Sequence, residues 1–434
     1  PPSCLSIRWI WRALVLTLSV SLFSSFGTFN LNTSASAAEA EPSIVAQSAI
    51  TMDLETGEII YSKEADAQHY PASTTKLLTG LLLAENKQKS DQLVYTEAAK
   101  AQPAYSLDDS FMGGSIKVGD KISADDIMKG LLLFSGNDTA YVISDNVAGD
   151  STKFAEMMNA KAKELGAHNS NFVTPNGLHD DNHYTTAYDL SLITKAAFGN
   201  EWERSVMELP EASIYINGSK VMLENRNLTL GKNGNIGGKT GYTSLAGGCL
   251  ATVYERDGRK IVGVVLKSTQ VDNEDPTKFN DMDAIMNYSY DVQKEVYKSS
   301  GEEVGTASVE YKSFGFFGPK KTVNVPIKLA QDVTYYKNAI NDAESKINYS
   351  SSNASAWNLI FNKDVQLTYT TRNHSENVAG TVEISLGTIL KDNLLLYIGT
   401  LVGIIIIISL IFMLKSLSFN RRNRRSSYRR GRRR

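Results

Sequence analysis

Ser73 and Lys76 stand three positions apart and could form a nucleophile and its base. On a helix, positions i and i+3 share a face, so the Lys76 amine can reach the Ser73 hydroxyl. A serine hydroxyl is a weak nucleophile unless a base takes its proton, and lysine can do so only when burial or nearby cations lower its pKa. The chain has one Ser-x-x-Lys match, which alone equally fits an ordinary exposed helical turn.

A second motif, Ser135-x-Asn137, follows an apolar run. In a loop, a serine and an asparagine two positions apart can supply a proton relay and an amide clamp for a substrate backbone. Another Ser-x-Asn match begins at Ser144. We favour Ser135, because Gly136 suits a loop that approaches a ligand closely, whereas Ser144 lies in a helix expected to begin near Asp138.

The third motif is Lys239-Thr240-Gly241, which follows Gly237 and Gly238 and leads into strand-like sequence. Glycines on both sides would let a ligand lie against the strand edge. The Lys239 and Thr240 side chains could then hold an anionic carboxylate. Taken alone, the motif also fits a plain β-turn.

Two histidines, His179 and His183, have the i, i+4 spacing of a helical metal site. Pro175, Asn176 and Gly177 directly precede them and predict a loop, so helical ligand geometry is not expected. The sequence therefore favours no metal site here, and neither histidine is assigned to catalysis.

The composition is that of a folded protein, and its charge distribution does not favour nucleic-acid binding. Of its 434 residues, 42% are hydrophobic and 21% charged, which allows two or three folded units. Two cysteines, Cys4 and Cys249, exclude a disulfide-stapled fold or a cysteine-based zinc cluster. Twelve of the 45 basic residues lie outside 38–392, which leaves 33 basic against 47 acidic residues there. This acidic body argues against nucleic acid as a partner.

The N-terminal segment has the pattern of a secretory signal. Arg8 and Arg12 precede an apolar run over 13–29, and small residues follow at 35–37. We predict a signal peptide over 1–37, cleaved after Ala37. An uncleaved N-terminal anchor is the alternative.

The C-terminal segment predicts a transmembrane helix. Residues 393–414 are 22 residues without a charge, long enough to cross a bilayer as a helix. Residues 415–434 hold Lys415 and nine arginines, which should stay cytoplasmic. Residues 38–392 are then extracellular, on a single-pass protein of the cell membrane. The basic tail could instead bind nucleic acid, but its place directly after the span favours lipid headgroups.

Between these ends, the sequence mixes helices with antiparallel strands. Hairpins are expected at 47–61 and 249–266, and helices at 74–85, 151–165 and 278–297.

From residue 301 to 392 the sequence pattern changes to short runs in which apolar and polar residues alternate, such as 322–327 and 365–369. These runs predict a small all-β domain. The polar stretch 348–355 predicts an exposed loop within it.

Together, the three motifs resemble the ordered set of the penicillin-recognising serine acyltransferases. The chain is similar to the low-molecular-mass penicillin-binding proteins of the serine-type D-alanyl-D-alanine carboxypeptidase family. Further similarity lies in Asn176-Gly177-Leu178 and in 186–190, and the resemblance covers about residues 40–392.

The resemblance implies an α+β catalytic domain over 38–298, with helices packed on an antiparallel sheet and the Ser73 helix at their junction. A β-sandwich domain over 299–392, the transmembrane helix at 393–414 and the tail at 415–434 would follow. It calls for no metal and no cofactor.

The implied partners are a peptidoglycan stem peptide ending in D-Ala-D-Ala and β-lactam antibiotics as covalent inhibitors. Ser73 would attack the penultimate D-alanine carbonyl with Lys76 as base, and water would later free the shortened peptide. Ser135 would relay a proton to the leaving amine, and Asn137 would hold the peptide amide.

The third motif has a binding role in the same scheme. Lys239 and Thr240 would bind the terminal carboxylate beside Gly241. The backbone N–H groups of Ser73 and Tyr242 would form the oxyanion hole.

Three alternatives stay open to different degrees. A class A β-lactamase needs a Glu-x-x-x-Asn loop, but between 138 and 238 no Glu stands four positions before an Asn. A non-catalytic cell-wall or β-lactam sensor would have no need of Ser73 together with Lys76. An endopeptidase that cuts cross-links cannot be separated by sequence.

Overall fold

The structure is a computed structural model that describes residues 40–102, 105–271, 275–349 and 354–430. Within 422–430 it describes the backbone alone. The predicted signal peptide over 1–37 lies outside the described residues.

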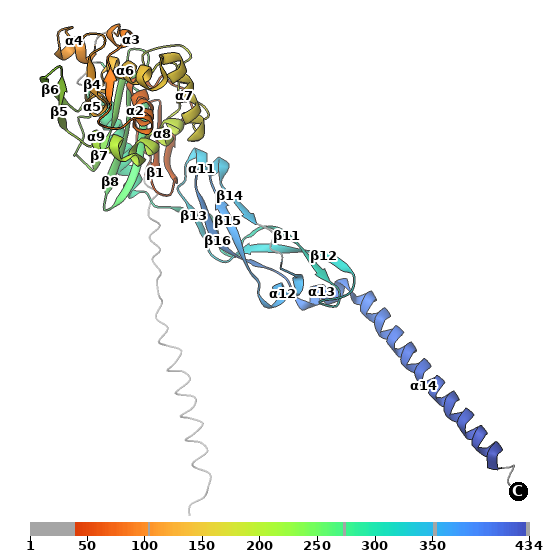
Figure 1. Cartoon of the computed structure of the whole chain (residues 1–434). Helices are drawn as coiled ribbons and strands as arrows, with labels where there is room; N and C mark the ends of the chain where they lie inside the picture. The colour runs from red at the N-terminus through yellow and green to blue at the C-terminus, as the bar shows by residue number, and fades with distance from the viewer. Residues whose placement is uncertain (1–39, 103–104, 272–274, 350–353, 431–434) are drawn as a thin grey trace, which may run out of the picture. The chain divides into compact units, whose positions relative to one another are not determined.

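A five-stranded antiparallel sheet forms the centre of the N-terminal part, where Figure 1 labels its strands β1, β7 and β8. Its strand order is β2-β1-β9-β8-β7. The strands are β1 (Ser48–Asp53), β2 (Ile59–Lys63), β7 (Asn235–Thr243), β8 (Gly247–Arg256) and β9 (Arg259–Ser268). Both predicted hairpins are thus confirmed.

Both faces of this sheet are covered by helices. Along β9, Ile261 and Val265 pack with the helix α10 (Thr277–Asp291), while Val262 and Val264 join the larger helical core on the other side. Because strand side chains alternate between faces, such continuous apolar runs are expected only where both faces are buried.

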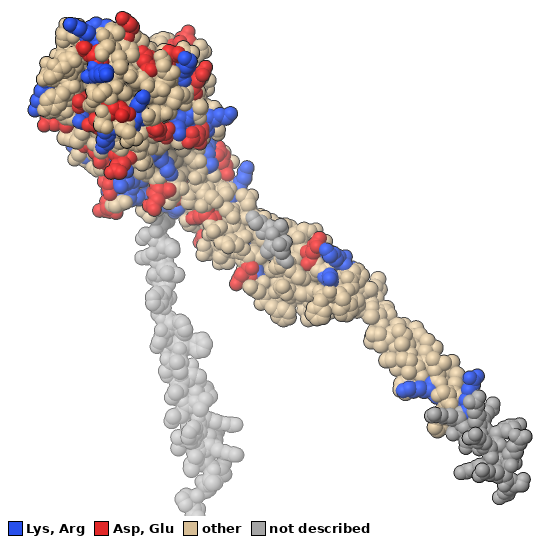
Figure 2. All heavy atoms as spheres, in the orientation of Figure 1, with Lys and Arg blue, Asp and Glu red and all other residues tan. Residues whose placement is uncertain are grey.

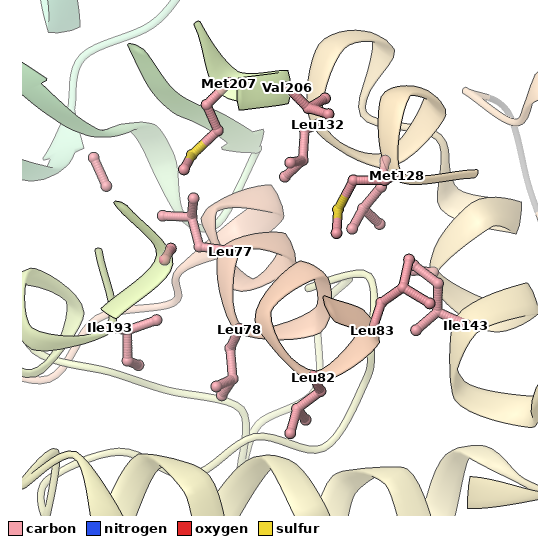
Figure 3. Close-up of a cluster of buried hydrophobic side chains, with 14 of the residues drawn as sticks. Leu77, Leu78, Leu82, Leu83, Met128, Leu132, Ile143, Ile193, Val206 and Met207 are labelled. Carbon is pink, nitrogen blue, oxygen red and sulfur yellow. The ribbon is translucent and has the colours of Figure 1, made fainter. Parts of the chain in front are cut away.

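Helix α2 (Lys76–Asn86) runs through the larger core. All five of its leucines are buried: Leu77, Leu78, Leu81, Leu82 and Leu83. Figure 3 shows the side chains that surround them: Met128, Leu132, Ile143, Ile193, Val206 and Met207. The residues that follow Ser73 are therefore fixed on several sides by apolar packing.

The other elements of the N-terminal part are short or flank α2. The helices are α3 (Glu97–Lys100), α4 (Leu107–Phe111), α5 (Ala124–Lys129), α6 (Asn137–Ala148), α7 (Ser151–Glu164), α8 (Ala187–Gly199) and α9 (Glu201–Met207). A π-helical turn, η2, covers Gly130–Phe134. Two hairpins pair β3 (Gln92–Val94) with β4 (Lys121–Ser123) and β5 (Glu211–Ile216) with β6 (Ser219–Glu224). The predicted helices at 74–85 and 151–165 are confirmed as α2 and α7.

The helix predicted over 278–297 is wrong at its C-terminal end. Helix α10 stops at Asp291, and Val292 takes an extended backbone. The following residues form β10 (Glu295–Lys298), which pairs with β13 (Val333–Tyr335). This pairing is made with a strand far along the chain, so local periodicity could not reveal it.

A second antiparallel sheet occupies the C-terminal part, with strand order β11-β12-β16-β15-β14. Its strands are β11 (Glu303–Lys312), β12 (Lys320–Leu329), β14 (Lys346–Tyr349), β15 (Asp364–Thr370) and β16 (Ser375–Val382). Three short helices accompany it: α11 (Ala339–Glu344), α12 (Ala356–Phe361) and α13 (Leu386–Asp392). Alternate residues of β11, such as Ala307, Val309 and Tyr311, enter a core of their own. The alternating runs at 322–327 and 365–369 lie in β12 and β15, and of the predicted loop at 348–355 residues 350–353 are not described.

The last helix, α14 (Leu394–Arg430), carries the apolar stretch. Within its segment Leu394–Arg421, the most apolar 18-residue window has a mean hydropathy of 2.8, and none of that window is buried against the rest of the protein. Figure 2 shows this stretch free of charge on the visible face until the basic residues begin. By length and composition, α14 could cross a membrane.

Glu203 of α9 is a buried carboxyl without a described hydrogen-bond partner at either oxygen. It lies against Gly80 of α2, where an added Cβ would meet Glu203 Oε1 at 2.7 Å. Burial raises the pKa of Glu203 well above its ordinary value. The native state therefore favours the protonated acid.

We expect Glu203→Gln, a mimic of that acid, to raise the Tm of the full chain at pH 8 and to change it little at pH 4. The pKa of Glu203 is higher in the native state than in the unfolded state. The free energy of unfolding therefore falls as the pH rises above the unfolded-state pKa. Thermal unfolding in detergent at both pH values measures this. An equal shift at both would contradict a protonated Glu203.

Candidate active site

Ser73 lies on the short 3₁₀ turn η1 (Ala72–Thr75), directly before α2. Ala72 has a left-handed backbone, with φ of 49°, which is strained for a residue other than glycine. The loop at Gly177 packs closely against this turn, since a Cβ on Gly177 would lie 1.9 Å from the Ala72 carbonyl oxygen. Only glycine fits there, so the Asn176-Gly177 pair helps to hold the turn that carries Ser73.

Lys76 is completely buried and donates to three oxygens. Its Nζ lies 2.9 Å from Ser73 Oγ, 3.1 Å from Asn137 Oδ1 and 3.0 Å from the Asn176 carbonyl oxygen. Burial and the neighbouring Arg226 guanidinium lower the pKa of Lys76 to about 7, against an opposing effect of Asp138. A lysine with such a pKa can accept a proton near neutral pH.

Ser135 and Asn137 follow the π turn η2, and both side chains line the same cavity as Ser73. Ser135 has a left-handed backbone with φ of 72°, where the chain leaves η2 and enters α6. The competing Ser144 is buried within α6, where its hydroxyl donates to the Tyr141 carbonyl oxygen. Of the two Ser-x-Asn pairs, the structure brings the one at Ser135 to Ser73.

Asp138 fixes this segment, and sequence reasoning assigned it no role. Its carboxylate accepts from the backbone N–H of Leu107 at 2.9 Å and of Asp108 at 3.2 Å, and from the Tyr95 hydroxyl at 3.0 Å. Burial raises the pKa of Asp138. The residue thus joins α4 to α6 behind Asn137.

Strand β7 brings Lys239, Thr240 and Gly241 alongside the Ser73 turn. A Cβ on Gly241 would lie 3.0 Å from the backbone nitrogen of Ser73, so a side chain here would push the strand away. Lys239 is buried, and its Nζ donates to the Thr240 carbonyl oxygen at 3.0 Å. Burial, together with Lys76 and Arg226, holds the pKa of Lys239 well below its usual range.

Most of these residues line a cavity of about 550 Å³, but the buried Lys76 and Lys239 are not among its lining residues. Ser73, Ser135, Asn137, Thr240, Gly241 and Tyr242 line it, with Tyr105, Leu178, Arg226, Leu228, Thr243, Gln270, Lys278 and Phe279. Among these described lining residues none is acidic, whereas two are cationic. The cavity therefore suits an anionic group beside the Ser73 hydroxyl.

Arg226 and Lys278 are the lining cations that the motifs did not reveal. The Arg226 guanidinium carbon lies 4.5 Å from the Phe134 ring centroid and 5.0 Å from that of Tyr105. Lys278 Nζ donates to Gln270 Oε1 at 2.8 Å. Neither residue belongs to one of the three motifs, so the sequence offered no signal for it.

The two histidines lie in a loop, as predicted, and His183 has a bracing role. Its Nδ1 accepts from the backbone N–H groups of Val173 and Thr174 at 3.0 and 3.1 Å, which leaves Nε2 to donate to Thr75 Oγ1 at 2.9 Å. Burial lowers the pKa of His183 to about 4, so the ring stays neutral. His179 pairs with Asp181 at the surface. In the described part of the chain, no three His, Cys, Asp or Glu side chains are grouped to hold a metal ion.

Two solved structures share their fold with more than half of this chain. The DD-transpeptidase of Streptomyces K15 is 29% identical and has a TM-score of 0.51, over 58% of this chain and 99% of that one. A penicillin-binding protein homologue of Mycobacterium tuberculosis is 26% identical with a TM-score of 0.55, over 59% of this chain and 96% of that one.

Sequence comparison finds carboxypeptidases of several bacteria. DacF of Bacillus subtilis is 31% identical over 51% of this chain and 57% of the relative, and DacD of Escherichia coli is 33% identical over 59% and 66%. The chain thus spans less than two thirds of the length of these relatives. DacB2 of Mycobacterium tuberculosis is 32% identical over 50% of this chain and 73% of its own length.

The sequence profile described as D-alanyl-D-alanine carboxypeptidase, peptidase S11, matches residues 34–270. With Ser73 and the β7 residues Thr240 and Gly241 on one cavity, and the Lys76 amine in hydrogen-bond contact with Ser73, the chain belongs to the D-alanyl-D-alanine carboxypeptidase family.

Proposed function

We propose that the chain removes the C-terminal D-alanine from peptidoglycan stem pentapeptides through a serine acyl-enzyme, and that penicillin acylates the same serine. The observation that carries this proposal is the buried Lys76 amine, 2.9 Å from Ser73 Oγ, with its pKa lowered to about 7. A neutral amine at this distance can take the hydroxyl proton as the nucleophile attacks.

In the first step, Ser73 Oγ bonds to the carbonyl carbon of the penultimate D-alanine while its proton passes to Lys76. The negative charge that develops on the carbonyl oxygen is held by the backbone N–H groups of Ser73 and Tyr242. The C–N bond then breaks, and Ser135 relays a proton to the leaving amine of D-alanine. The shortened peptide stays as an ester on Ser73.

In the second step, water attacks this ester and releases the peptide, with Lys76 again available as base. Asn137 holds the peptide amide in register through both steps. The position of Asn137 supports this role, since its side-chain oxygen already accepts from Lys76 and its residue lines the cavity.

Terminal carboxylate recognition falls to Lys239 and Thr240, beside Gly241. The charge pattern supports this role, because Arg226 and Lys278 add to the positive potential of the cavity. Burial and these crowded cations depress the pKa of Lys239. A substrate carboxylate would raise that pKa again and so favour the charged, binding form.

A β-lactamase is less well supported, because the 138–238 segment has no Glu-x-x-x-Asn loop and none of the described lining residues is acidic. An endopeptidase would use the same acyl-enzyme step. Product analysis with a synthetic pentapeptide and a cross-linked peptide distinguishes these activities.

We further propose that residues 393–414 anchor the protein in the cell membrane, with 415–434 cytoplasmic and the catalytic domain outside. The apolar stretch of α14 supports this. Residues 299–392 would then be a β-sandwich domain that acts as a spacer above the lipid, and their separate apolar core supports a separate unit.

We expect Ser73→Ala to abolish both fluorescent-penicillin labelling and D-alanine release, because it removes the attacking oxygen. Ser135→Ala should slow D-alanine release by roughly 10²-fold or more, as expected for a proton-transfer group. Ser144→Ala is the matched control and should be unchanged. Labelling that survives Ser73→Ala, or an equal loss in Ser135→Ala and Ser144→Ala, would contradict the assignments.

The acylation rate should rise with pH through a midpoint near the pKa of Lys76, since only its neutral amine accepts the proton. Arg226→Gln removes the cation that lowers this pKa, so the midpoint should move to higher pH. Lys278→Gln is the control, because Lys278 is not among the groups that shift Lys76. Stopped-flow acylation by a chromogenic β-lactam measures both. A midpoint that stays fixed in Arg226→Gln would show that Arg226 does not lower this pKa, and an acylation rate without a midpoint near 7 in the unmodified chain would refute Lys76 as the base.

An epitope tag after Arg434 should resist protease added to intact cells, while residues 38–392 are digested. The arginines of 415–434 oppose translocation, so they should hold this end in the cytoplasm. Immunoblotting before and after permeabilisation checks the result. Cleavage of the tag in intact cells would reverse the proposed topology.

A further inference from the structure

The turn between β11 and β12 presents two phenylalanines to solvent. Phe316 is 87% exposed and Phe317 is 62% exposed. Exposing two adjacent large apolar side chains is unfavourable in water, and a contiguous patch of this kind commonly marks a contact surface.

The turn has a defined structure. The Phe314 N–H donates to the Phe317 carbonyl oxygen at 3.1 Å, and the Gly315 N–H donates to that of Lys312 at 3.0 Å. The Phe314 and Phe317 rings stack with centroids 5.2 Å apart. Gly315 and Gly318 take left-handed φ angles that let the chain reverse here. Phe316 is therefore held at the tip by ordered backbone.

This turn is fastened to the first residues of α14. The Tyr397 hydroxyl donates to the Ser313 carbonyl oxygen at 2.6 Å, and its ring lies 5.4 Å from that of Phe314. Just before α14, the Asn393 side-chain amide donates to the Tyr311 hydroxyl at 2.8 Å. Ser313 and Asn393 are both buried. These contacts join the strand end to the start of the helix.

The contacts also set the level of the turn along the helix. The apolar stretch begins at Leu394, and Tyr397 is three residues later, roughly 4.5 Å along the axis. The phenylalanine turn therefore lies beside the first turn of the apolar segment. Leu394 and Leu395, 54% and 86% exposed, extend the apolar surface there.

We propose that Phe316 and Phe317 insert into the membrane at its outer water boundary, next to the point where α14 enters. This inference rests on the proposal that α14 is the membrane anchor, and it adds a second contact. Aromatic side chains favour this boundary. Lys312, Lys320 and Lys321 border the turn and would lie at the level of anionic headgroups.

A second copy of the chain is the other conceivable occupant. The apolar surface of the turn continues directly into residues of α14 that would face lipid, which favours one shared environment for both. Two phenylalanines alone also offer little area for a stable protein interface. Lipid is thus the occupant that the observations favour.

The test uses the full chain in vesicles of equal parts phosphatidylcholine and phosphatidylglycerol. An environment-sensitive fluorophore is attached at Phe316→Cys, with Phe317→Cys as a second reporter and Tyr215→Cys as the matched control. Tyr215 is an aromatic residue of β5, 58% exposed. Cys4→Ser removes one competing thiol, and Cys249 is buried.

Brominated lipid should quench most of the emission from positions 316 and 317 and little of that from 215, with a blue shift at the first two. Equal, weak quenching at all three positions, in chains that float with the vesicles, would overturn this inference and leave the anchor intact. Chains that fail to float would overturn the anchor as well. A blue shift that depends on the protein-to-lipid ratio but not on bromine would assign the turn to a second copy.

Discussion

The contact between the Lys76 amine and the Ser73 hydroxyl is the interaction on which the candidate site depends. Burying a lysine amine is unfavourable while it is charged, and this cost is what lowers its pKa to about 7. Three oxygens, from Ser73, Asn137 and Asn176, lie within hydrogen-bond distance of Nζ. The charged amine can donate to all three, and the neutral amine can donate to two and accept from the Ser73 hydroxyl. The site thus keeps the amine dry enough to act as a base and bound tightly enough to stay in place.

Each of these three oxygens comes from a different part of the chain, so the fold must bring the parts very close together. Gly177, beside the Ala72 carbonyl, permits the approach of the Asn176 loop to the Ser73 turn, and Gly241, beside the Ser73 nitrogen, permits that of β7. His183 braces the Ser73 turn from behind through Thr75. Its pKa of about 4 keeps it neutral, so it adds no further charge near Lys76.

The sequence was most informative where spacing is short and local. The Ser73–Lys76 spacing predicts one helical face, and the structure places both groups within hydrogen-bond distance. Gly136 and the helix expected after it favoured Ser135 over Ser144, and of these two serines only Ser135 lines the cavity. The hairpins and the long helices follow from alternation and 3.6-residue periodicity.

Features that depend on distant pairing could not be read in this way. Arg226 reaches the cavity from a segment with no motif, and Asp138 looks like any residue at the start of a helix. The early end of α10 is set by pairing of β10 with β13. Glu203 shows no sign in sequence that it is buried. In each case the residues in contact lie far along the chain, beyond any local window.

The pKa of Lys76 is the most direct measure of the central claim, because it determines whether the amine can act as base. Nuclear magnetic resonance of reductively ¹³C-methylated or side-chain-labelled lysine can follow its titration, with Lys76→Arg used to assign the signal. The account predicts a midpoint near 7, far below the usual lysine value of about 10.4. A Lys76 signal that titrates in the usual range would mean that the amine is charged at neutral pH, and the proposed acylation step would fail.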